Sequence, residues 1–348
     1  MTSSWDGIPY ITIGEHYHQR FGGKVYKIPV SVVDDCPNRR GLKGMQTCVF
    51  CDVWGSAART ETMVLPLREQ IEKVQGLLHR KYKPRHYLVY FQAYTNTFTK
   101  VSALRANFET ALSYDFVKGL VIGTRPDCLS PAVMQLWQEF HEHSFVAVEL
   151  GVQSFDDGQL AFMRRGHTAR ESLAAIEKIS KNTSVDLGIH LIFGNPGETD
   201  EQMIETAKIC NDLPITNVKL HNLHVLKNTP LEEMYKQGLF TPVELETYAR
   251  RVRLFLEHLS PRLAVHRLAA YSSRWEELIA PRWTSDKMGS HQKILMALKK
   301  EGGYQGRLWN GSGAEEIQQK IKLQNRLVAK SSSPRSSTNS STDTRQII

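Results

Sequence analysis

Three cysteines near the N-terminus carry the clearest chemical signal in this sequence. Cys36, Cys48 and Cys51 follow the spacing C-x11-C-x2-C. Structural zinc sites and iron–sulfur clusters are normally held by four protein ligands, so three thiolates predict a metal centre with one open position. Because a substrate or cofactor can bind at such a position, we expect the cysteine loop to form part of an active site.

The remaining cysteines and the hydropathy pattern limit the class of protein. The 348-residue chain has five cysteines, and the isolated Cys128 and Cys210 do not suggest a disulfide framework. We expect both to be buried as small hydrophobic side chains. No signal peptide precedes the first predicted strand, and no stretch approaches the roughly 18 apolar residues of a membrane span. These features predict a cytoplasmic protein with no membrane partner.

The charge balance is moderately basic, with a formal net charge of +8. Lysine and arginine neutralise phosphates, so this balance fits a polyanionic partner such as RNA. Candidate basic patches lie at residues 79–86, at 250–253 and at 299–300. Charge runs are also common on solvated faces, and both interpretations stay open.

Short β-branched runs alternate with amphipathic helical segments over most of the chain. Repeated strand and helix units predict a parallel sheet, and no G-x-G-x-x-G motif follows the first strand to support a dinucleotide-binding fold. We therefore expect an α/β fold, a partial TIM barrel of about six βα units with a small α-rich C-terminal extension. The predicted strands are 28–33, 87–91, 119–122, 145–150, 187–193 and 217–220.

This pattern also predicts how the chain is divided. Residues 1–26 form an N-terminal segment, 27–225 the partial barrel, 226–330 the extension and 331–348 a tail. The extension contains two amphipathic helical segments, 242–259 and 285–300, around a short strand candidate at 263–267. The tail is rich in serine and threonine, and we expect it to be disordered because it has too little apolar surface to bury.

Polar or glycine-rich segments follow each of the predicted strands. In TIM barrels the active-site residues lie at the C-terminal ends of the strands, so these segments are expected to surround one site. The segments are the cysteine loop, 92–97, 124–127, 153–154, 194–198 and 221–224.

The cysteine loop, with Phe50 before its last cysteine, resembles that of radical S-adenosylmethionine (SAM) enzymes. The eleven-residue gap after Cys36 and the stretch Cys-Pro-Asn-Arg are similar to the YhcC/YtqA-like family, which is related to the radical SAM domain of the Elongator catalytic subunit. The resemblance covers roughly residues 15–306. Further matching segments are 20–23, 91–97, 123–128, 149–154, 165–168, 219–221, 280–283 and 305–306.

The resemblance implies a [4Fe-4S] cluster on Cys36, Cys48 and Cys51, with SAM bound at the open iron. Reduction of such a cluster cleaves SAM to methionine and a 5′-deoxyadenosyl radical, which abstracts hydrogen from a substrate. The electron would come from an external one-electron donor of the flavodoxin or ferredoxin type. No catalytic residue is assigned beyond the cluster.

Position by position, the resemblance also assigns candidate ligands. The guanidinium of Arg125 suits the SAM carboxylate. Lys219 and His221 alternate along a predicted strand, so they share a face and could meet an acidic substrate. His167 could be either a structural residue or a residue that faces the substrate. A metal site at His221 and His224 is disfavoured, because this spacing in a strand points the two rings to opposite faces. The residues assigned to SAM are Gln92, Tyr94, Asn96, Arg125, Glu149, Gln153, Ser154, Ile192 and Gly194.

The leading hypothesis is a radical SAM enzyme that modifies RNA, with a tRNA wobble uridine as its target by analogy to the Elongator relatives. Two alternatives stay open. The enzyme could act on a small metabolite or a peptide, or the chain could be a non-catalytic RNA-binding or zinc-binding module on the same scaffold. The sequence does not name the substrate atom, the fate of SAM, the electron donor or the oligomeric state.

Overall fold

The computed structural model describes residues 7–52, 54–55, 62–272, 274–312 and 315. The predicted tail at 331–348 and the end of the predicted extension lie outside these residues. None of the described helices is both long enough and apolar enough to cross a membrane. The strands are β1 (Val25–Val30), β2 (His86–Phe91), β3 (Val117–Thr124), β4 (Phe145–Gln153), β5 (Asp186–Phe193), β6 (Asn217–Asn222), β7 (Val225–Leu226), β8 (Ala264–Val265) and β9 (Leu278–Ala280).

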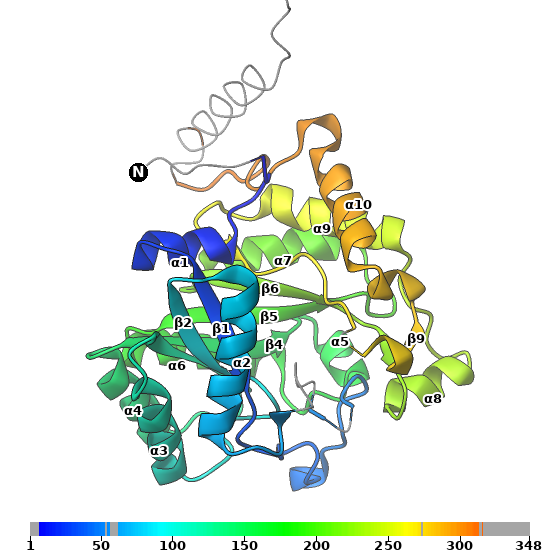
Figure 1. Ribbon diagram of the computed structural model, residues 1–348. Coiled ribbons are helices and arrows are strands. Elements are labelled where there is room, and N and C mark those ends of the chain that lie inside the picture. The colour runs from blue at the N-terminus through cyan, green and yellow to red at the C-terminus, as the bar shows by residue number, and fades with distance from the viewer. Residues whose placement is uncertain (1–6, 53, 56–61, 273, 313–314, 316–348) are drawn as a thin grey trace, which may run out of the picture.

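Seven strands form one parallel sheet in the order β1-β2-β3-β4-β5-β6-β8. The sheet is strongly curled, because Lys27 on β1 contacts both Glu149 on β4 and His266, directly after β8. The predicted partial barrel is thus confirmed (Figure 1). The seventh strand comes from a segment that we expected in the extension, and the sheet therefore continues beyond residue 225. Because β8 has only two residues, its sequence pattern is too short to predict its pairing with β6.

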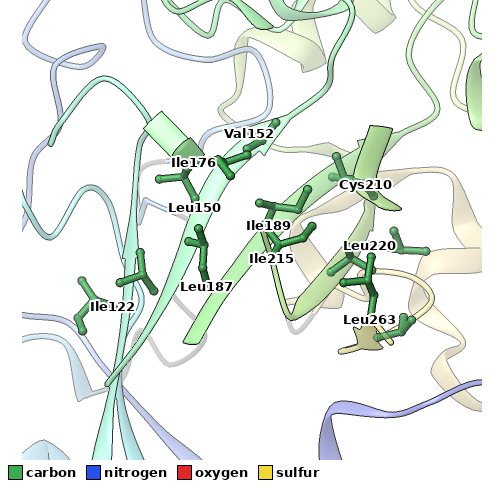
Figure 2. Close-up of a cluster of buried hydrophobic side chains, with 14 of the residues drawn as sticks. Ile122, Leu150, Val152, Ile176, Leu187, Ile189, Cys210, Ile215, Leu220 and Leu263 are labelled. Atoms are coloured by element: carbon green, nitrogen blue, oxygen red, sulfur yellow. The ribbon is translucent and has the colours of Figure 1, made fainter. Parts of the chain in front are cut away.

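Helices cover the convex face of this sheet, where alternate residues of each strand are apolar and fully buried. Figure 2 shows part of this layer, in which Leu150, Ile189 and Leu220 from three strands pack with Ile176 and Cys210 from helices. The helices are α1 (Ile13–Phe21), α2 (Leu67–Tyr82), α3 (Val101–Leu112), α4 (Pro131–His141), α5 (Asp157–Phe162), α6 (Ala169–Asn182), α7 (Asp200–Asp212), α8 (Pro230–Lys236), α9 (Leu245–His258) and α10 (Lys287–Lys299).

The concave face has a different composition at its two ends. At the N-terminal end of the strands, Tyr17 of α1 packs with Leu88, Val121 and Phe145 in a small apolar cluster. Thr12 caps α1 and forms a parallel bridge to Val265 of β8. The segment before β1 therefore closes this end of the barrel, and polar side chains occupy the concave face above it.

Helices α9 and α10 pack on one another and α9 packs on α7, so the C-terminal part extends the helical layer. The short strands β7 and β9 form a separate antiparallel pair. The connection between β8 and β9 runs along the C-terminal ends of the barrel strands, where Tyr271 and Arg274 help to line a cavity.

We predict that Tyr17→Ala lowers the free energy of unfolding by about 3 kcal/mol, because it leaves a void in the apolar cluster beneath the barrel. Urea denaturation measures this change. The control Tyr235→Ala alters a side chain that is 38% exposed and should cost no more than about 0.5 kcal/mol. Equal effects of the two substitutions would show that α1 is not part of the barrel core.

Candidate functional site

A cavity of about 400 Å³ lies at the C-terminal ends of the barrel strands. The cysteine loop forms one side of it, and residues after β8 form another. Its lining includes Cys36, Cys48, Cys51, Gln92, Tyr94, Arg125, Glu149, Gln153, Arg165, His190, Ile192, Lys219, His221, Asn222, His224, Arg267, Tyr271 and Arg274. Five of the six predicted strand-end segments therefore contribute to one site, whereas the segment 194–198 does not line the cavity.

The cysteine loop is compact in spite of its long gap. Asn38 is 2% exposed, and its Nδ2 donates to the carbonyls of Gln46 (2.7 Å) and Arg164 (2.6 Å). Gly166 has φ +69°, and a Cβ there would collide with Met45 of the loop. These contacts hold the eleven-residue gap against the segment that follows α5.

The three thiols face the cavity in an environment that includes arginines. Cys36 and Cys48 are buried and Cys51 is partly exposed. Burial, together with Cys48 and Asp52, raises the pKa of Cys51 to about 12. Arg165 Nη1 lies 3.2 Å from Cys48 Sγ and Arg39 Nη1 lies 3.9 Å from Cys51 Sγ. Three neighbouring thiolates repel one another, so a bound cationic centre would stabilise their deprotonated forms.

The positions of the three thiols and of the other metal-ligating side chains bear on the kind of metal centre that could bind. In the part of the chain that the structure describes, no group of three or more His, Cys, Asp or Glu side chains converges on a point where one ion could sit. A single zinc ion needs such convergence. The thiolate ligands of a [4Fe-4S] cluster bind different iron atoms and do not need it.

Six of the residues assigned to SAM line the cavity, and three do not. Asn96 instead donates to the carbonyls of Phe91 (2.8 Å) and Gly123 (3.0 Å), which ties β2 to β3. Ser154 donates to Gln159 at the start of α5, and the Gly194 N–H donates to Glu198 (2.7 Å). These three residues therefore support the walls of the site.

Arg125 lines the cavity, but its guanidinium already has partners. Its Nε and Nη2 donate to the carboxylate of Asp127 at 2.8 and 2.9 Å. It also donates to Asn38 of the cysteine loop and to the carbonyl of Arg165 (2.7 Å). Arg125 thus fixes the cysteine loop to the end of β3, and a SAM carboxylate would compete with an existing ion pair.

Two of the SAM-assigned residues have unusual backbone conformations. Tyr94 has φ +56° and Gln153 has φ +72°, in the left-handed region that non-glycine residues seldom adopt. Both side chains line the cavity. Strained backbone of this kind concentrates at ligand-binding sites, where the surrounding structure maintains it.

Glu149 lies within β4, and its side chain is 2% exposed at the base of the cavity. It accepts hydrogen bonds from Tyr90 Oη (2.7 Å) and Lys219 Nζ (2.8 Å), and it pairs with Lys27. His190 Nε2 is 2.6 Å away. Burial acts to raise the pKa of Glu149, but Lys219 and Lys27 hold it well below its usual range.

The histidines of the site are uncharged. Burial and then Lys219 lower the pKa of His190 to about 4, and burial and then Arg267 lower that of His224 to about 4. His221 and His224 both line the cavity, although we expected them on opposite faces. The reason is that β6 ends at Asn222, so the alternation of a strand does not reach residue 224.

His167 does not line the cavity, which disfavours the substrate-facing one of its two interpretations. Its ring is buried, with Nδ1 3.4 Å from Ser172 Oγ and with no partner for Nε2. Burial and the neighbouring Arg165 lower its pKa to about 3. His167 therefore packs behind the wall that carries Arg165.

Sequence reasoning gave no role to several cavity residues, among them Arg165, His190, Arg267 and Arg274. His190 had a detectable signal, because it is in register with Lys219 on the neighbouring strand β6 and so shares its face. Arg165 stands beside His167 in a matched segment. Arg267 and Arg274 follow β8, a strand too short for its direction to be predicted.

Replacing Glu149 by Gln leaves Lys27 and Lys219 without a negative partner. We predict a loss of about 3 kcal/mol in the free energy of unfolding at pH 7. Since the folded-state pKa is depressed, this contribution exists above the unfolded pKa of about 4.3 and is lost as the pH falls below it. Urea titrations at several pH values should thus show the two proteins converging in acid.

The control for this prediction is Glu139→Gln. Glu139 is exposed and pairs with Arg105 at the surface, so its replacement should have a much smaller effect. A constant difference between wild type and Glu149→Gln down to pH 2 would contradict the assigned role of the charge.

Comparison with known proteins agrees with this geometry. Residues 30–210 match the model of the radical SAM superfamily, and 215–300 match that of the Radical_SAM C-terminal domain. YtqA of Bacillus subtilis (strain 168) is 34% identical over 300 residues, which cover 86% of this chain and 92% of YtqA.

Two further similarities are more restricted. The tRNA uridine(34) acetyltransferase of Methanocaldococcus jannaschii is 31% identical over 143 residues, which are 38% of this chain and 26% of that protein. The solved structure of Methanocaldococcus infernus Elp3 has a TM-score of 0.56 at 17% identity, covering 80% of this chain and 63% of that one, and shows a shared fold. The chain belongs to the radical SAM superfamily and, within it, to the YhcC/YtqA-like family.

Proposed function

We propose that this chain reductively cleaves SAM at a [4Fe-4S] cluster held by Cys36, Cys48 and Cys51. The observation that carries the proposal is the position of three free thiols on one side of a cavity that has room for a ligand. When bound, the cluster and SAM would supply the radical chemistry.

The protein's own contribution is to position SAM and to exclude water. Gln92, Tyr94 and Gln153 offer polar side chains to the cavity, and Ile192 offers an apolar surface. We propose these four as SAM contacts, together with the partly engaged Arg125. Arg165, beside Cys48, is a further candidate because its guanidinium Nε is buried and has no partner among the residues that the structure describes.

We also propose that the substrate is tRNA and that the target is its wobble uridine. Two observations support this proposal: the net charge of +8 and the partial similarity to a protein named tRNA uridine(34) acetyltransferase. An external flavodoxin-type or ferredoxin-type donor would supply the electron, because the cysteines that remain, Cys128 and Cys210, stand singly in the sequence.

We predict that Cys36→Ala, Cys48→Ala and Cys51→Ala each abolish the iron–sulfur absorbance at about 400 nm. Each substitution should also reduce the formation of 5′-deoxyadenosine to background. The assay uses anaerobically reconstituted protein, dithionite and SAM. Cys210→Ala is the matched control, because Cys210 is buried in the helical layer and should leave both signals unchanged. One zinc per wild-type chain, with no such absorbance, would contradict the proposal.

We predict that the protein binds tRNA and that the logarithm of the binding constant falls linearly with the logarithm of the salt concentration. The reason is that lysines and arginines that bind phosphates release the counterions of the tRNA. Filter binding at salt concentrations from about 50 to 200 mM measures the slope. Nucleoside analysis of tRNA from cells with and without the gene should then differ at the wobble position. Unchanged nucleosides and no salt-dependent binding would instead favour a small-molecule or peptide substrate.

A further inference from the structure

Arg267 is a cavity-lining arginine with no carboxylate partner among the described residues. It follows β8, and its Nε donates to the carbonyl of Leu220 (3.3 Å). Its Nη2 lies 2.6 Å from Nδ1 of His221, a ring that burial and Arg267 itself keep uncharged. A guanidinium in these surroundings is costly unless an anion also binds there.

The charges around Arg267 do not balance. The floor cluster consists of Lys27, Glu149, Lys219 and Arg267, and its three cations share one carboxylate. Burial, with Arg267 and Lys27, lowers the pKa of Lys219 to about 8, so this lysine is still protonated at pH 7. The neighbouring histidines are neutral, and the cluster therefore has an excess of two positive charges.

Polar atoms that have no hydrogen-bond partner among the described residues line the same cavity. Asn222 is 3% exposed and lines the cavity, and its Nδ2 is buried with no hydrogen-bond partner. Its Oδ1 accepts from the Ala270 N–H (2.9 Å), which fixes the amide orientation. Tyr271, also in the lining, has a buried hydroxyl without a partner. Unsatisfied buried donors and excess positive charge in one cavity are the features of an anion site.

We infer that the cavity floor beside Arg267 binds an anionic oxygen group of the substrate, a phosphate or a carboxylate, with Asn222 as a second donor. This inference rests on the proposed function, because it concerns the substrate that would enter the same cavity. For a tRNA substrate, the group would be a phosphate of the target nucleotide.

The carboxylate of SAM is a poorer candidate for this position. The family resemblance puts that carboxylate at the open iron, and Arg165 lies close to the cysteines, with Nη1 3.2 Å from Cys48 Sγ. Arg267 contacts residues of β6, His221 and Leu220. Arg165 and Arg267 therefore belong to different walls of the cavity.

The test measures the melting temperature of the anaerobically reconstituted full-length protein during titration with inorganic phosphate or acetate. Sodium chloride at matched ionic strength is the reference. We expect a saturable rise with phosphate, or with acetate if the substrate bears a carboxylate. Arg267→Gln should weaken the apparent affinity by about tenfold or more, because it removes a charged hydrogen-bond donor. Arg170→Gln, at an exposed position of α6, should behave like wild type.

A second variant keeps the test decisive if Arg267→Gln does not fold. Asn222→Asp retains the acceptor for the Ala270 N–H and adds a carboxylate to the lining of the cavity that contains the cations. It should raise the melting temperature without added anion and remove the response to phosphate. A response to phosphate and acetate no larger than that to chloride, or an unchanged response in Arg267→Gln, would overturn the inference.

Equilibrium binding of SAM separates the two possible sources of the anion. We expect Arg267→Gln to bind SAM within about twofold of wild type, and SAM not to displace phosphate. Displacement, with a tenfold loss of SAM affinity in the variant, would assign the site to SAM and overturn the inference. None of these readouts depends on SAM cleavage, so a protein that binds phosphate but makes no 5′-deoxyadenosine would refute the proposed function alone.

Discussion

The carboxylate of Glu149 joins side chains from five strands at one buried point. It lies on β4 and contacts Lys27 of β1, Tyr90 of β2, His190 of β5 and Lys219 of β6. A buried carboxylate is tolerated when its partners satisfy its charge and lone pairs, and these partners reach it only if the sheet is curled. The network separates the apolar cluster around Tyr17 from the cavity and forms the floor of that cavity.

A second set of contacts fixes the cysteine loop above this floor. Asn38, Arg125 and Arg165 link the loop to the end of β3 and to the segment after α5. The ion pair between Arg274 and Asp52 joins the loop to the C-terminal connection. The thiols and the floor cluster thus belong to one connected framework, which fits chemistry that needs a ligand held between a metal centre and a substrate.

The fold and the position of the three cysteines at the strand-end cavity could both be predicted from the sequence, because both depend on local pattern. Strand and helix periods are repeated along the chain, and cysteine spacing is visible in one short stretch. Three assignments, Asn96, Ser154 and Gly194, put a residue at the correct strand end but not in the cavity lining. Strand-end position is local, whereas the direction of a side chain there depends on turns and on partners from other segments.

The missed residues have a related physical cause. Arg267 and Arg274 follow a two-residue strand, so no periodic pattern reports where they point. Glu149 was predicted as a SAM ligand, and its partner Lys27 comes from 122 residues earlier in the chain. Pairings of this kind depend on how the sheet curls, and pattern analysis of one sequence does not reveal that curvature.

The most direct test of the account is electron paramagnetic resonance of the reduced, reconstituted protein with and without SAM. Three cysteines with one open iron predict a [4Fe-4S] signal whose line shape changes when SAM is added, because SAM would become a ligand of the cluster. A signal that SAM does not alter, or the absence of any iron–sulfur signal in protein that retains stoichiometric zinc, would contradict the central claim.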